Sequence, residues 1–222
     1  MTERSTALTV RTALPRPGHY ARGAETVDQI LDAALDVLID EGASAFTLRR
    51  IANRCGIQVG KLTHHFARKE LLIQHMLGSL LDYYEALLDE SVRQPGLDAQ
   101  VQLERMIGIV LDDIVSRRTT HVFTELWALS NHNEFVAERV AAFYAHAHRL
   151  LAAPIAVLNP ALSPDQAEIL ARYISATMEG TTIFAGHGKP WAHQMPQLKA
   201  IAVKGLIDLV RTIRPQDVQP AG

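Results

Sequence analysis

Basic side chains are concentrated in one short part of this chain, where they could bind phosphate groups. Residues 42–72 contain six lysine and arginine residues and one glutamate, whereas residues 73–222 contain 12 basic and 16 acidic residues. A positively charged segment in an otherwise acidic chain attracts the phosphate backbone of nucleic acids. The distribution of charge therefore indicates a nucleic-acid-binding unit attached to a body with another role.

Two short helices joined by a turn are predicted within residues 47–66, which read TLRRIANRCGIQVGKLTHHF. Apolar residues recur at helical spacing on both sides of the turn: Leu48, Ile51, Ala52 and Cys55, then Leu62 and Phe66. Thr47 is a favourable N-cap, and Gly56 suits the turn because glycine readily takes a positive φ. A compact helix pair of this kind commonly places its second helix in the DNA major groove.

The outer side of the second helix is predicted to face DNA. If its apolar residues point inward, a rotation of about 100° per residue brings four other residues to the outer side: Gly60, Lys61, Thr63 and His64. The absence of a side chain at Gly60 permits close approach, and Lys61 can reach a guanine edge or a phosphate. Thr63 and His64 can donate to phosphates or contact bases.

Further DNA contacts are predicted near the helix starts. Thr47 and Lys69 are placed to bind phosphates through their side chains and free backbone N–H groups. Gln58 and Val59 open the second helix and belong to the predicted contact set. Arg49 belongs to it as well, although an exposed arginine without a DNA contact is an equally good interpretation.

Apolar periodicity predicts helices throughout the rest of the chain, with no strand of useful length. Thr26 and Gln29 have capping-box spacing, so the first helix is expected to start there and to end at Glu41. The other expected helices cover about residues 69–91, 98–116, 120–130, 133–152, 163–185 and 197–211. The fold class is therefore all-α, with about nine helices: a three-helix helix-turn-helix domain followed by a larger helical domain.

Four segments are expected on this basis. Residues 1–23, with four arginines and no apolar period, are expected to form a flexible basic arm. Residues 24–68 are expected to form the helix-turn-helix DNA-binding domain, and residues 69–214 a helical ligand-binding and dimerisation domain. The Pro- and Gln-rich residues 215–222 are expected to form a frayed tail.

Composition indicates a soluble, cytoplasmic, globular protein. Hydrophobic residues make up 48% and charged residues 21% of the chain, which argues against disorder. The single cysteine, Cys55, excludes an intramolecular disulfide, fits a reducing compartment and is expected to be a small core residue. No apolar run of membrane-spanning length and no secretory signal is recognised, so no membrane partner is expected.

The N-terminal pattern resembles the DNA-binding domain of TetR-family transcriptional regulators. The residues that carry the resemblance are Thr47, Leu48, Arg49, Arg50, Ile51, Ala52, Gly56, Ile57, Gly60, Leu62, His65, Phe66, Lys69, Glu70, Leu71 and Leu72. The similarity extends back to about Thr26. It implies DNA contacts at Thr47, Lys61, His64 and Lys69, and a ligand-sensing body of about six helices whose last two pair with a second subunit.

Three positions depart from the usual pattern of that family. Thr63 lies where the family usually has tyrosine, and Gln58 where it usually has serine or threonine. Cys55 lies where it often has a small residue such as alanine. The first two positions face DNA, so the resemblance implies the mode of binding and leaves the operator sequence open.

A ligand site is predicted around residues 123–135, FTELWALSNHNEF. Aromatic walls with polar groups near a helix end could line a cavity for a small, partly polar molecule. The candidate ligand-binding residues are Phe123, Trp127, His132, Tyr144, His148 and Met178. An ordinary core with a polar helix junction is at least as good an interpretation. The pattern faintly resembles regulators of the choline–betaine type, and it does not identify the ligand.

Six histidines lie beyond residue 120, at positions 121, 132, 146, 148, 187 and 193. A metal site needs two or more converging histidines, often with a carboxylate, and His146 and His148 are predicted to face different ways on one helix. The chain also lacks a nucleophile elbow, an H-E-x-x-H pair and a Cys/His ligand spacing. We therefore expect no metal, no cofactor and no enzymatic activity. A histidine-rich, metal-dependent helical enzyme is one alternative.

The helix pattern and the resemblance together predict a homodimeric repressor. The last two helices carry more apolar residues than one face needs: Ile169, Tyr173, Ile174, Thr177, Leu198, Ile201, Leu206 and Leu209. A dimer would pair two recognition helices with the half-sites of a palindromic, double-stranded DNA operator. An unidentified small molecule is expected to release the operator by moving the helix that starts at Lys69. A DNA-binding protein without a ligand is a second alternative.

Overall fold

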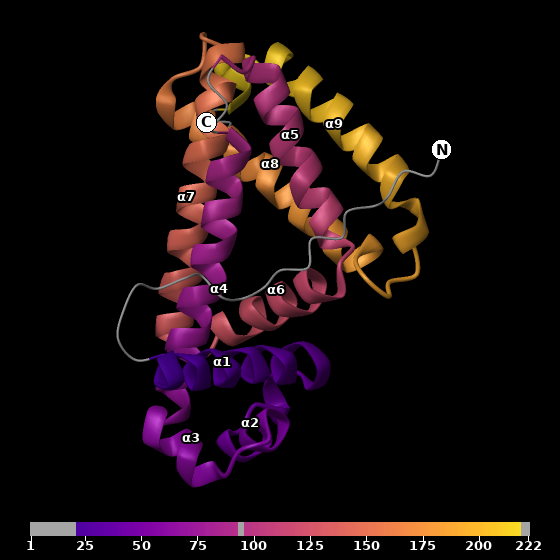
Figure 1. The fold of residues 1–222 in the computed structure, drawn as a ribbon. Helices are drawn as coiled ribbons and strands as arrows, with labels where there is room; N and C mark the ends of the chain where they lie inside the picture. Colours follow the sequence, from indigo (N-terminus) through magenta and orange to yellow (C-terminus); the bar gives the residue numbers. More distant parts are fainter. Residues whose placement is uncertain (1–20, 93–95, 219–222) are drawn as a thin grey trace. The chain divides into compact units, whose positions relative to one another are not determined.

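The computed structural model describes residues 21–92 and 96–218, and helices are the regular elements of these ranges (Figure 1). The α-helices are α1 (Ala21–Glu41), α2 (Leu48–Cys55), α3 (Val59–His65), α4 (Lys69–Val92), α5 (Ala99–Ile114), α6 (Arg117–Ser130), α7 (Glu134–Leu158), α8 (Pro164–Ala185) and α9 (Met195–Thr212). Short 3-10 helices are η1 (Ala43–Ala45), η2 (Ala192–Gln194) and η3 (Pro215–Val218). For the described part of the chain, the predicted all-α fold with nine α-helices is confirmed.

The chain divides between Met76 and Leu77 into two compact units. The N-terminal unit holds α1, α2, α3 and the beginning of α4. The C-terminal unit holds the rest of α4 together with α5 to α9. One continuous helix, α4, therefore belongs to both units.

The N-terminal unit is built around apolar side chains from all of its helices. α1 packs on α2, and α2 packs on α3. The fully buried side chains of this unit include Ile30, Leu38, Ile51, Leu62 and Leu72. Phe66 is also buried, with 3% of its surface exposed, so both apolar residues predicted to point inward after the turn are confirmed as core. Cys55 is only partly buried.

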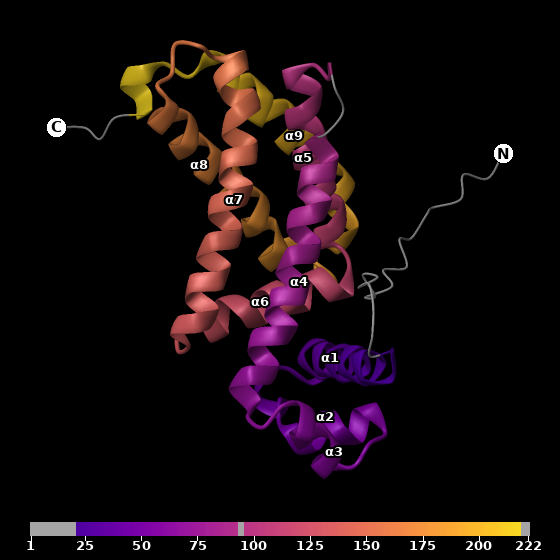
Figure 2. The same cartoon turned by 60° about the vertical axis from the view of Figure 1, so that its left-hand side comes forward.

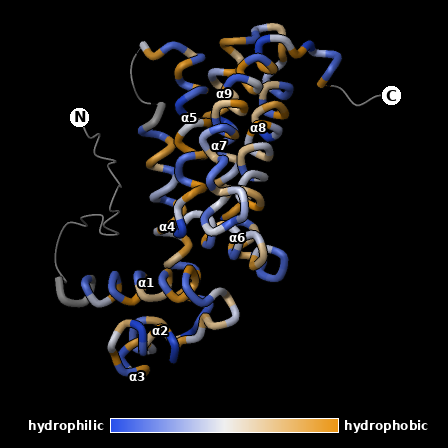
Figure 3. Tube along the Cα trace, turned by 90° about the vertical axis from the view of Figure 1, so that its right-hand side faces the viewer, coloured by the Kyte–Doolittle hydropathy of each residue, from blue (hydrophilic) through white to orange (hydrophobic). Residues whose placement is uncertain are grey.

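The C-terminal unit is a bundle in which α4, α5, α7 and α8 run lengthwise and α6 lies across them (Figures 1 and 2). α7 contacts α5, α6 and α8, and α9 contacts α5 and α8. The core cluster includes Leu103, Met106, Ile107, Leu111, Leu151, Ile155 and Ile174. Figure 3 shows hydrophobic and hydrophilic positions alternating along the helices, which is the pattern of helices that bury one face.

Side-chain caps set four helix starts where the sequence predicted them. The capping residues are Thr47, Asp98, Asn133 and Ser163, and each side chain accepts a backbone N–H from the first turn. Ser163 and Gln166 also form a capping box, because the Gln166 side chain accepts from the Ser163 N–H at 2.9 Å. Each cap satisfies backbone donors that a helix N-terminus leaves without a partner.

The predicted starts of two helices are wrong. α1 begins at Ala21 rather than Thr26, so residues 21–23 of the predicted arm are helical, whereas residues 1–20 lie outside the described ranges. α6 begins after Ser116 rather than near residue 120, because the Ser116 hydroxyl accepts the Thr119 N–H and caps the helix earlier.

The predicted end of α7 is also wrong, because the helix continues through Pro154 to Leu158 instead of stopping near residue 152. Proline inside a helix removes one hydrogen bond and disfavours the preceding turn. Pro154 and Ile155 are nevertheless buried in the C-terminal unit. Their packing there outweighs the local preference.

The end of the chain is more ordered than the predicted frayed tail. Residues 215–218 form η3, and Gln166 Nε2 donates to the Pro215 carbonyl at 2.9 Å. Arg214 forms an ion pair with Asp217 at 3.1 Å. Residues 219–222 of the predicted tail lie outside the described ranges.

α7 is the one described helix that is long and apolar enough, by length and composition, to cross a membrane. The sequence analysis did not recognise this. One such helix is weak support for a membrane segment, and α7 packs on four helices of the same unit. Its buried residues include Phe143, Leu151 and Ile155, as expected for a helix of a bundle.

Candidate nucleic-acid interface and effector cavity

The turn between α2 and α3 is defined by Gly56. This residue has φ 71° and ψ 24°, in the left-handed region that favours glycine, and its N–H bonds to the Asn53 carbonyl at 3.2 Å. The Ile57 N–H follows with a bond of 3.0 Å to the Ala52 carbonyl. These bonds close α2, and α3 starts two residues later. The helix-turn-helix is therefore set by contacts among neighbouring residues.

The outer side of α3 carries most of the residues predicted to contact DNA. Gln58, Val59, Gly60, Lys61 and His64 are all exposed, and they lie within seven consecutive residues. A Cβ atom added at Gly60 would meet no other atom within 4 Å, so the space beside it is open.

Thr63 differs from the other predicted DNA-facing residues. Its side chain is partly buried, and its hydroxyl donates to the Gly60 carbonyl at 3.1 Å. The hydroxyl hydrogen is thus used within α3, and what Thr63 can offer a partner is an acceptor and a methyl group.

Two of the six basic residues counted in this region are already paired within the N-terminal unit. Arg50 binds Glu41 at 2.7 Å, and Arg54 binds Asp40 with Asp36 at 3.7 Å. Arg49 is exposed and makes no ion pair with any residue of the described ranges. The positive charge facing outward is therefore smaller than the residue count indicates.

Thr47 and Lys69, the predicted phosphate anchors, both have roles inside the unit. The Thr47 hydroxyl accepts the Arg50 N–H at 3.2 Å and caps α2. The Lys69 ammonium lies 5.6 Å from the centroid of the Phe46 ring, within cation–π range. Both residues remain at least partly accessible.

The C-terminal unit contains an internal cavity of about 50 Å³. Five helices, α4 to α8, contribute to its wall. The lining residues are Tyr84, Leu87, Leu88, Ile109, Val110, Asp113, Ile114, Thr119, Phe123, Phe143 and Glu179. Within the described ranges, the wall thus holds two carboxylates and no basic side chain.

Three of the aromatic rings that line this cavity pack against one another. The ring of Tyr84 lies 5.1 Å from that of Phe123 and 6.5 Å from that of Phe143. The rings of Phe123 and Phe143 are 5.9 Å apart. The negative faces of such rings attract cations.

Asp113 ends a chain of hydrogen bonds that begins at Tyr84. The Thr119 hydroxyl donates to Asp113 Oδ2 at 2.6 Å. Because a hydroxyl has one hydrogen, the Tyr84 hydroxyl at 2.9 Å must donate to Thr119. Desolvation raises the pKa of Asp113 above its ordinary value, while the Thr119 hydrogen bond and the nearby Arg118 charge lower it.

Glu179 ends a second chain of hydrogen bonds. Trp127 Nε1 donates to the Tyr144 hydroxyl at 3.0 Å, and that hydroxyl donates to Glu179 Oε1 at 3.2 Å. Desolvation is the main cause that raises the pKa of Glu179 to about 7; the Tyr144 hydrogen bond opposes the rise and Asp113 adds to it. Desolvation also raises the pKa of Tyr144.

The residues predicted to bind a ligand are only partly brought together. Phe123 lines the cavity. Trp127 donates to the Tyr144 hydroxyl, which in turn donates to Glu179 of the cavity wall. His148 stacks on Tyr144, with ring centroids 6.0 Å apart, and desolvation lowers its pKa. The other two lie elsewhere: Met178 is buried in the core, and His132 is exposed after α6.

Sequence reasoning did not identify three residues of the wall, namely Tyr84, Asp113 and Thr119. One signal was available. Asp113 lies seven residues after the buried Met106, and Glu179 lies four after the buried Ser175, so each carboxylate follows the buried side of its helix. Charged residues are rarely found on such a side without a partner or a function.

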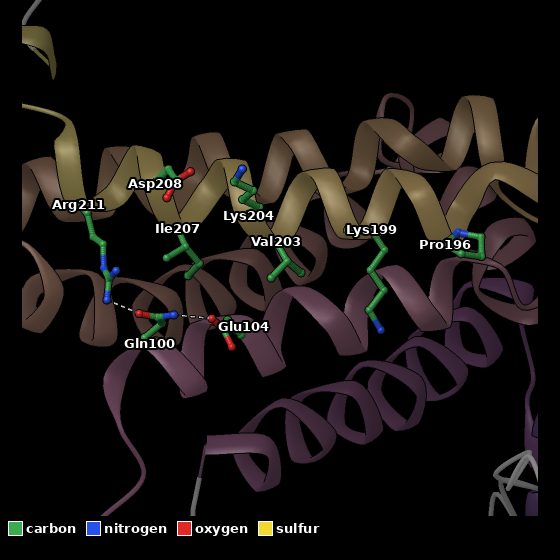
Figure 4. Close-up of a pocket in the computed structure, with 10 residues that line it drawn as sticks. Gln100, Glu104, Pro196, Lys199, Val203, Lys204, Ile207, Asp208 and Arg211 are labelled. Atoms are coloured by element: carbon green, nitrogen blue, oxygen red, sulfur yellow. Dashed lines mark hydrogen bonds between the residues drawn. The ribbon is translucent and has the colours of Figure 1, made fainter. Parts of the chain in front are cut away.

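A larger hollow of about 570 Å³ is a surface groove between α5 and α9 (Figure 4). Arg211 bonds to Gln100 there, and Gln100 donates to Glu104 at 2.6 Å. Lys199 forms an ion pair with Asp112 at 2.6 Å. Side chains of both signs already pair across this groove, whereas the wall of the smaller cavity combines carboxylates and aromatic rings.

The C-terminal histidines do not assemble a metal site in the part of the chain that the structure describes. No group of three or more histidine, cysteine, aspartate or glutamate side chains there could hold a metal ion. His121 and His187 have ring centroids 6.1 Å apart, and His146 bonds to Asp89 at 2.9 Å. These contacts involve two groups each.

Comparisons with known proteins agree with the two units. Residues 30–76 match the tetR family of bacterial regulatory proteins, and residues 99–208 match the C-terminal domain of BetI-type transcriptional repressors. The HTH-type transcriptional regulator BetI of Escherichia coli is 24% identical over 176 residues, which cover 75% of this chain and 88% of that protein. The HTH-type transcriptional repressor KstR2 of Mycolicibacterium smegmatis is 31% identical over 99 residues, which cover 43% of this chain and 44% of the repressor.

Solved structures share the fold. A transcriptional regulator from Rhodococcus sp. Rha1 has a TM-score of 0.70 at 24% identity, covering 83% of this chain and 95% of its own. A transcriptional regulator from Saccharomonospora viridis, solved in complex with choline, has a TM-score of 0.66 at 18% identity and covers 80% of this chain and 95% of its own. Together with the two family matches, these similarities lead to one conclusion: the chain belongs to the TetR family of bacterial transcriptional regulators and has a BetI-type C-terminal domain.

Proposed function

We propose that this DNA-binding transcriptional regulator is a ligand-responsive repressor, which binds a palindromic operator as a homodimer and leaves it when a small molecule enters the cavity. One observation carries the proposal: α4 lines the cavity through Tyr84 and also runs into the unit that carries α3. The TetR family consists of transcription regulators, so the alternative of a metal-dependent enzyme is dropped. A bacterial transcription regulator is consistent with the expected cytoplasmic location.

The proposed DNA contacts are those of the sequence analysis. Gly60, Lys61 and His64 are assigned to the groove, and Thr47 and Lys69 to phosphates, with Arg49, Gln58, Val59 and Thr63 completing the set. Exposure of α3 and the free charges of Lys61 and Arg49 support this assignment. Thr63 is expected to contribute through its methyl group and acceptor oxygen, because its hydrogen is bonded to Gly60.

The proposed dimer contact uses the outer faces of α8 and α9. Ile169, Tyr173 and Phe184 on α8 are 46%, 57% and 55% exposed, and Ile201 on α9 is 69% exposed. Ile174 and Leu206, which the sequence analysis included, are buried in the chain's own core and are withdrawn from the contact. An exposed apolar stripe over two neighbouring helices is typical of a surface covered by a second subunit.

The proposed effector is a small organic cation. Two carboxylates and three aromatic rings face one cavity whose described wall has no basic side chain, and such surroundings stabilise a positive charge. The choline complex of the Saccharomonospora viridis regulator supports the same class of ligand. Choline is therefore the first compound to test.

The small size of the empty cavity suggests how binding would act on DNA. Ligand sites commonly measure about 300–1,000 Å³, whereas this cavity measures about 50 Å³. A bound cation must therefore push its walls apart, and α4 is one of them. The ligand shifts the protein away from the DNA-bound state only if it binds the released state more tightly.

Binding of the full-length protein to DNA from its own promoter region tests the proposal. We expect sequence-selective binding that weakens as salt rises, and that also weakens when choline is added. Sodium chloride at the same concentration is the control for the added ionic strength. Sequence-selective binding that choline leaves unchanged would contradict the proposed effector, and absence of selective binding would contradict the repressor itself.

A pair of arginine variants sharpens the DNA assignment. Arg49→Ala is expected to weaken binding and to reduce the slope of log affinity against log salt by about one. Arg54→Ala is expected to change that slope less, because Arg54 is already paired with Asp40 and Asp36. Equal slopes for the two variants would contradict the expectation that the ion pairs of Arg54 keep it from binding DNA phosphates.

A further inference from the structure

The cavity of the C-terminal unit holds two carboxylates with unequal surroundings. We propose that Glu179 carries a proton in the empty cavity while Asp113 is ionised, and that a bound organic cation displaces this proton into solvent. Binding of the effector then exchanges a proton on the protein for the positive charge of the ligand. This inference rests on the cation-binding role proposed above.

Asp113 has the surroundings that favour a charged carboxylate. It accepts the Thr119 hydroxyl at 2.6 Å, and Thr119 in turn accepts the Tyr84 hydroxyl at 2.9 Å. The positive charge of Arg118, on α6, also lowers the pKa of Asp113. A carboxylate with a short hydrogen bond and a nearby guanidinium can remain ionised even when it is partly removed from water.

Glu179 has the weaker set of partners and is therefore the carboxylate that holds the proton. It accepts one longer hydrogen bond, of 3.2 Å, from Tyr144. The charge of Asp113 opposes its ionisation, and no basic side chain of the described residues lines the cavity. Two carboxylates in one apolar cavity cannot both ionise at low cost without a positive charge between them.

Other titratable and charged groups lie near Glu179 on four helices. They are Tyr84 of α4, Asp113 of α5, Arg118 of α6, and Tyr144 and His148 of α7. Tyr84 and Tyr144 have raised pKa values and stay protonated near neutral pH. His148 stacks on Tyr144, and desolvation lowers its pKa.

The exchange fixes the sign of the pH dependence. Well below the pKa of Glu179, the empty cavity carries the proton, so each bound cation releases about one proton and affinity rises about tenfold per pH unit. Well above that pKa, Glu179 is already ionised, and affinity becomes independent of pH. With a pKa of about 7, the change of slope is expected near neutral pH.

Calorimetric titration of the full-length protein with choline chloride tests the exchange. Choline keeps its charge at every pH, so any proton released comes from the protein. The titrations are made between about pH 6 and about pH 8.5, each in two buffers with different ionisation enthalpies. We expect proton release approaching one at the acidic end and near zero at the alkaline end, together with the matching change in affinity.

Two variants locate the proton. Glu179→Gln is expected to bind choline more weakly and to release no proton. Tyr144→Phe removes the hydrogen bond that lowers the pKa of Glu179, so the change of slope should move to higher pH. Glu138→Gln, an exposed carboxylate on α7, is the matched control and should behave like the unmodified protein.

The possible results separate this inference from the proposed function. Choline binding with constant affinity and no proton release contradicts a proton on Glu179 but leaves the proposed cation site standing. Proton release that persists in Glu179→Gln overturns the assignment to Glu179. No choline binding at any pH contradicts the proposed effector and removes the basis of the exchange.

Discussion

The DNA-reading unit and the effector cavity use charge in opposite ways. In the N-terminal unit, acidic residues of α1 neutralise Arg50 and Arg54, while Arg49 and Lys61 remain outside and unpaired within the described ranges. In the C-terminal unit, Asp113 and Glu179 face inward on a cavity whose described wall has no basic side chain. The N-terminal unit thus presents positive charge that DNA can neutralise. The cavity wall instead carries negative groups that a positively charged ligand could neutralise.

The two sites also differ in how they are assembled. The residues proposed to face DNA between Gln58 and His64 lie on one short helix and its N-cap. The cavity combines residues from Tyr84 to Glu179, brought together by five helices. The site on α3 should therefore tolerate substitutions of polar residues in the C-terminal unit. The cavity should depend on the packing of the whole C-terminal bundle.

Substitutions in the cores of the two units should have the largest effects, and they should affect operator binding and choline binding differently. Leu62→Ala and Leu111→Ala each remove a side chain with 0% exposure, which costs about 2–5 kcal/mol. Leu62→Ala should abolish operator binding but leave choline binding intact, because its cost falls on the N-terminal unit. Leu111→Ala should weaken both, since the body also carries the proposed dimer contact. Thermal unfolding, DNA titration and calorimetry measure the three effects.

Loss of choline binding in Leu62→Ala would contradict this comparison. It would mean that the N-terminal unit supports the cavity directly, and that the two sites are not built independently.

Removing the charge of Lys61 should have the next largest effect. Lys61→Ala is expected to weaken operator binding by about 1–3 kcal/mol, a factor of roughly 5–150. The fold should be unaffected, because the side chain is exposed and has no ion pair in the described ranges. Fluorescence anisotropy with labelled operator DNA measures the affinity. Arg149→Ala, an exposed basic position on α7, is the control and should bind normally.

A methyl group at Gly60 tests close approach to DNA. Gly60→Ala should weaken operator binding about tenfold if DNA lies against α3 at this point. Within the chain the new Cβ meets nothing within 4 Å, so stability should stay equal or rise by about 0.5–1 kcal/mol. Gly78→Ala on α4 also meets open space and serves as the control. Equal DNA affinities of the two variants would place DNA away from Gly60.

The smallest expected effect is a pH-dependent stability of the empty body. The pKa of Glu179 is about 7 in the folded chain and about 4.5 when solvated, so the folded state holds more protons between these values. Stability should therefore fall as pH rises through this range, and Glu179→Gln should lose that part of the fall. Unfolding midpoints of both proteins, measured from about pH 5 to about pH 8, should converge at the acidic end. Parallel curves would show that Glu179 does not titrate there.

Sequence reasoning succeeded where structure depends on neighbours along the chain. The caps at Thr47 and Ser163 and the turn at Gly56 were predictable, because each requires a particular residue type at a particular position. It failed where distant packing outweighed local preference. α7 runs through Pro154 because this residue is buried in the bundle, and local rules alone end the helix before it.

The sequence by itself determined the all-α class, the helix-turn-helix and the inward and outward sides of α3, since helical periodicity and turn chemistry operate over a few residues. Only the tertiary structure decided which charges are free and where an effector could bind. The pairs between α1 and α2 leave Arg49 rather than Arg54 available, and the meeting of α5 with α8 brings Asp113 and Glu179 to one cavity. The reason is physical: the pKa of a carboxylate depends on what surrounds it in space, and those neighbours lie far away in the chain.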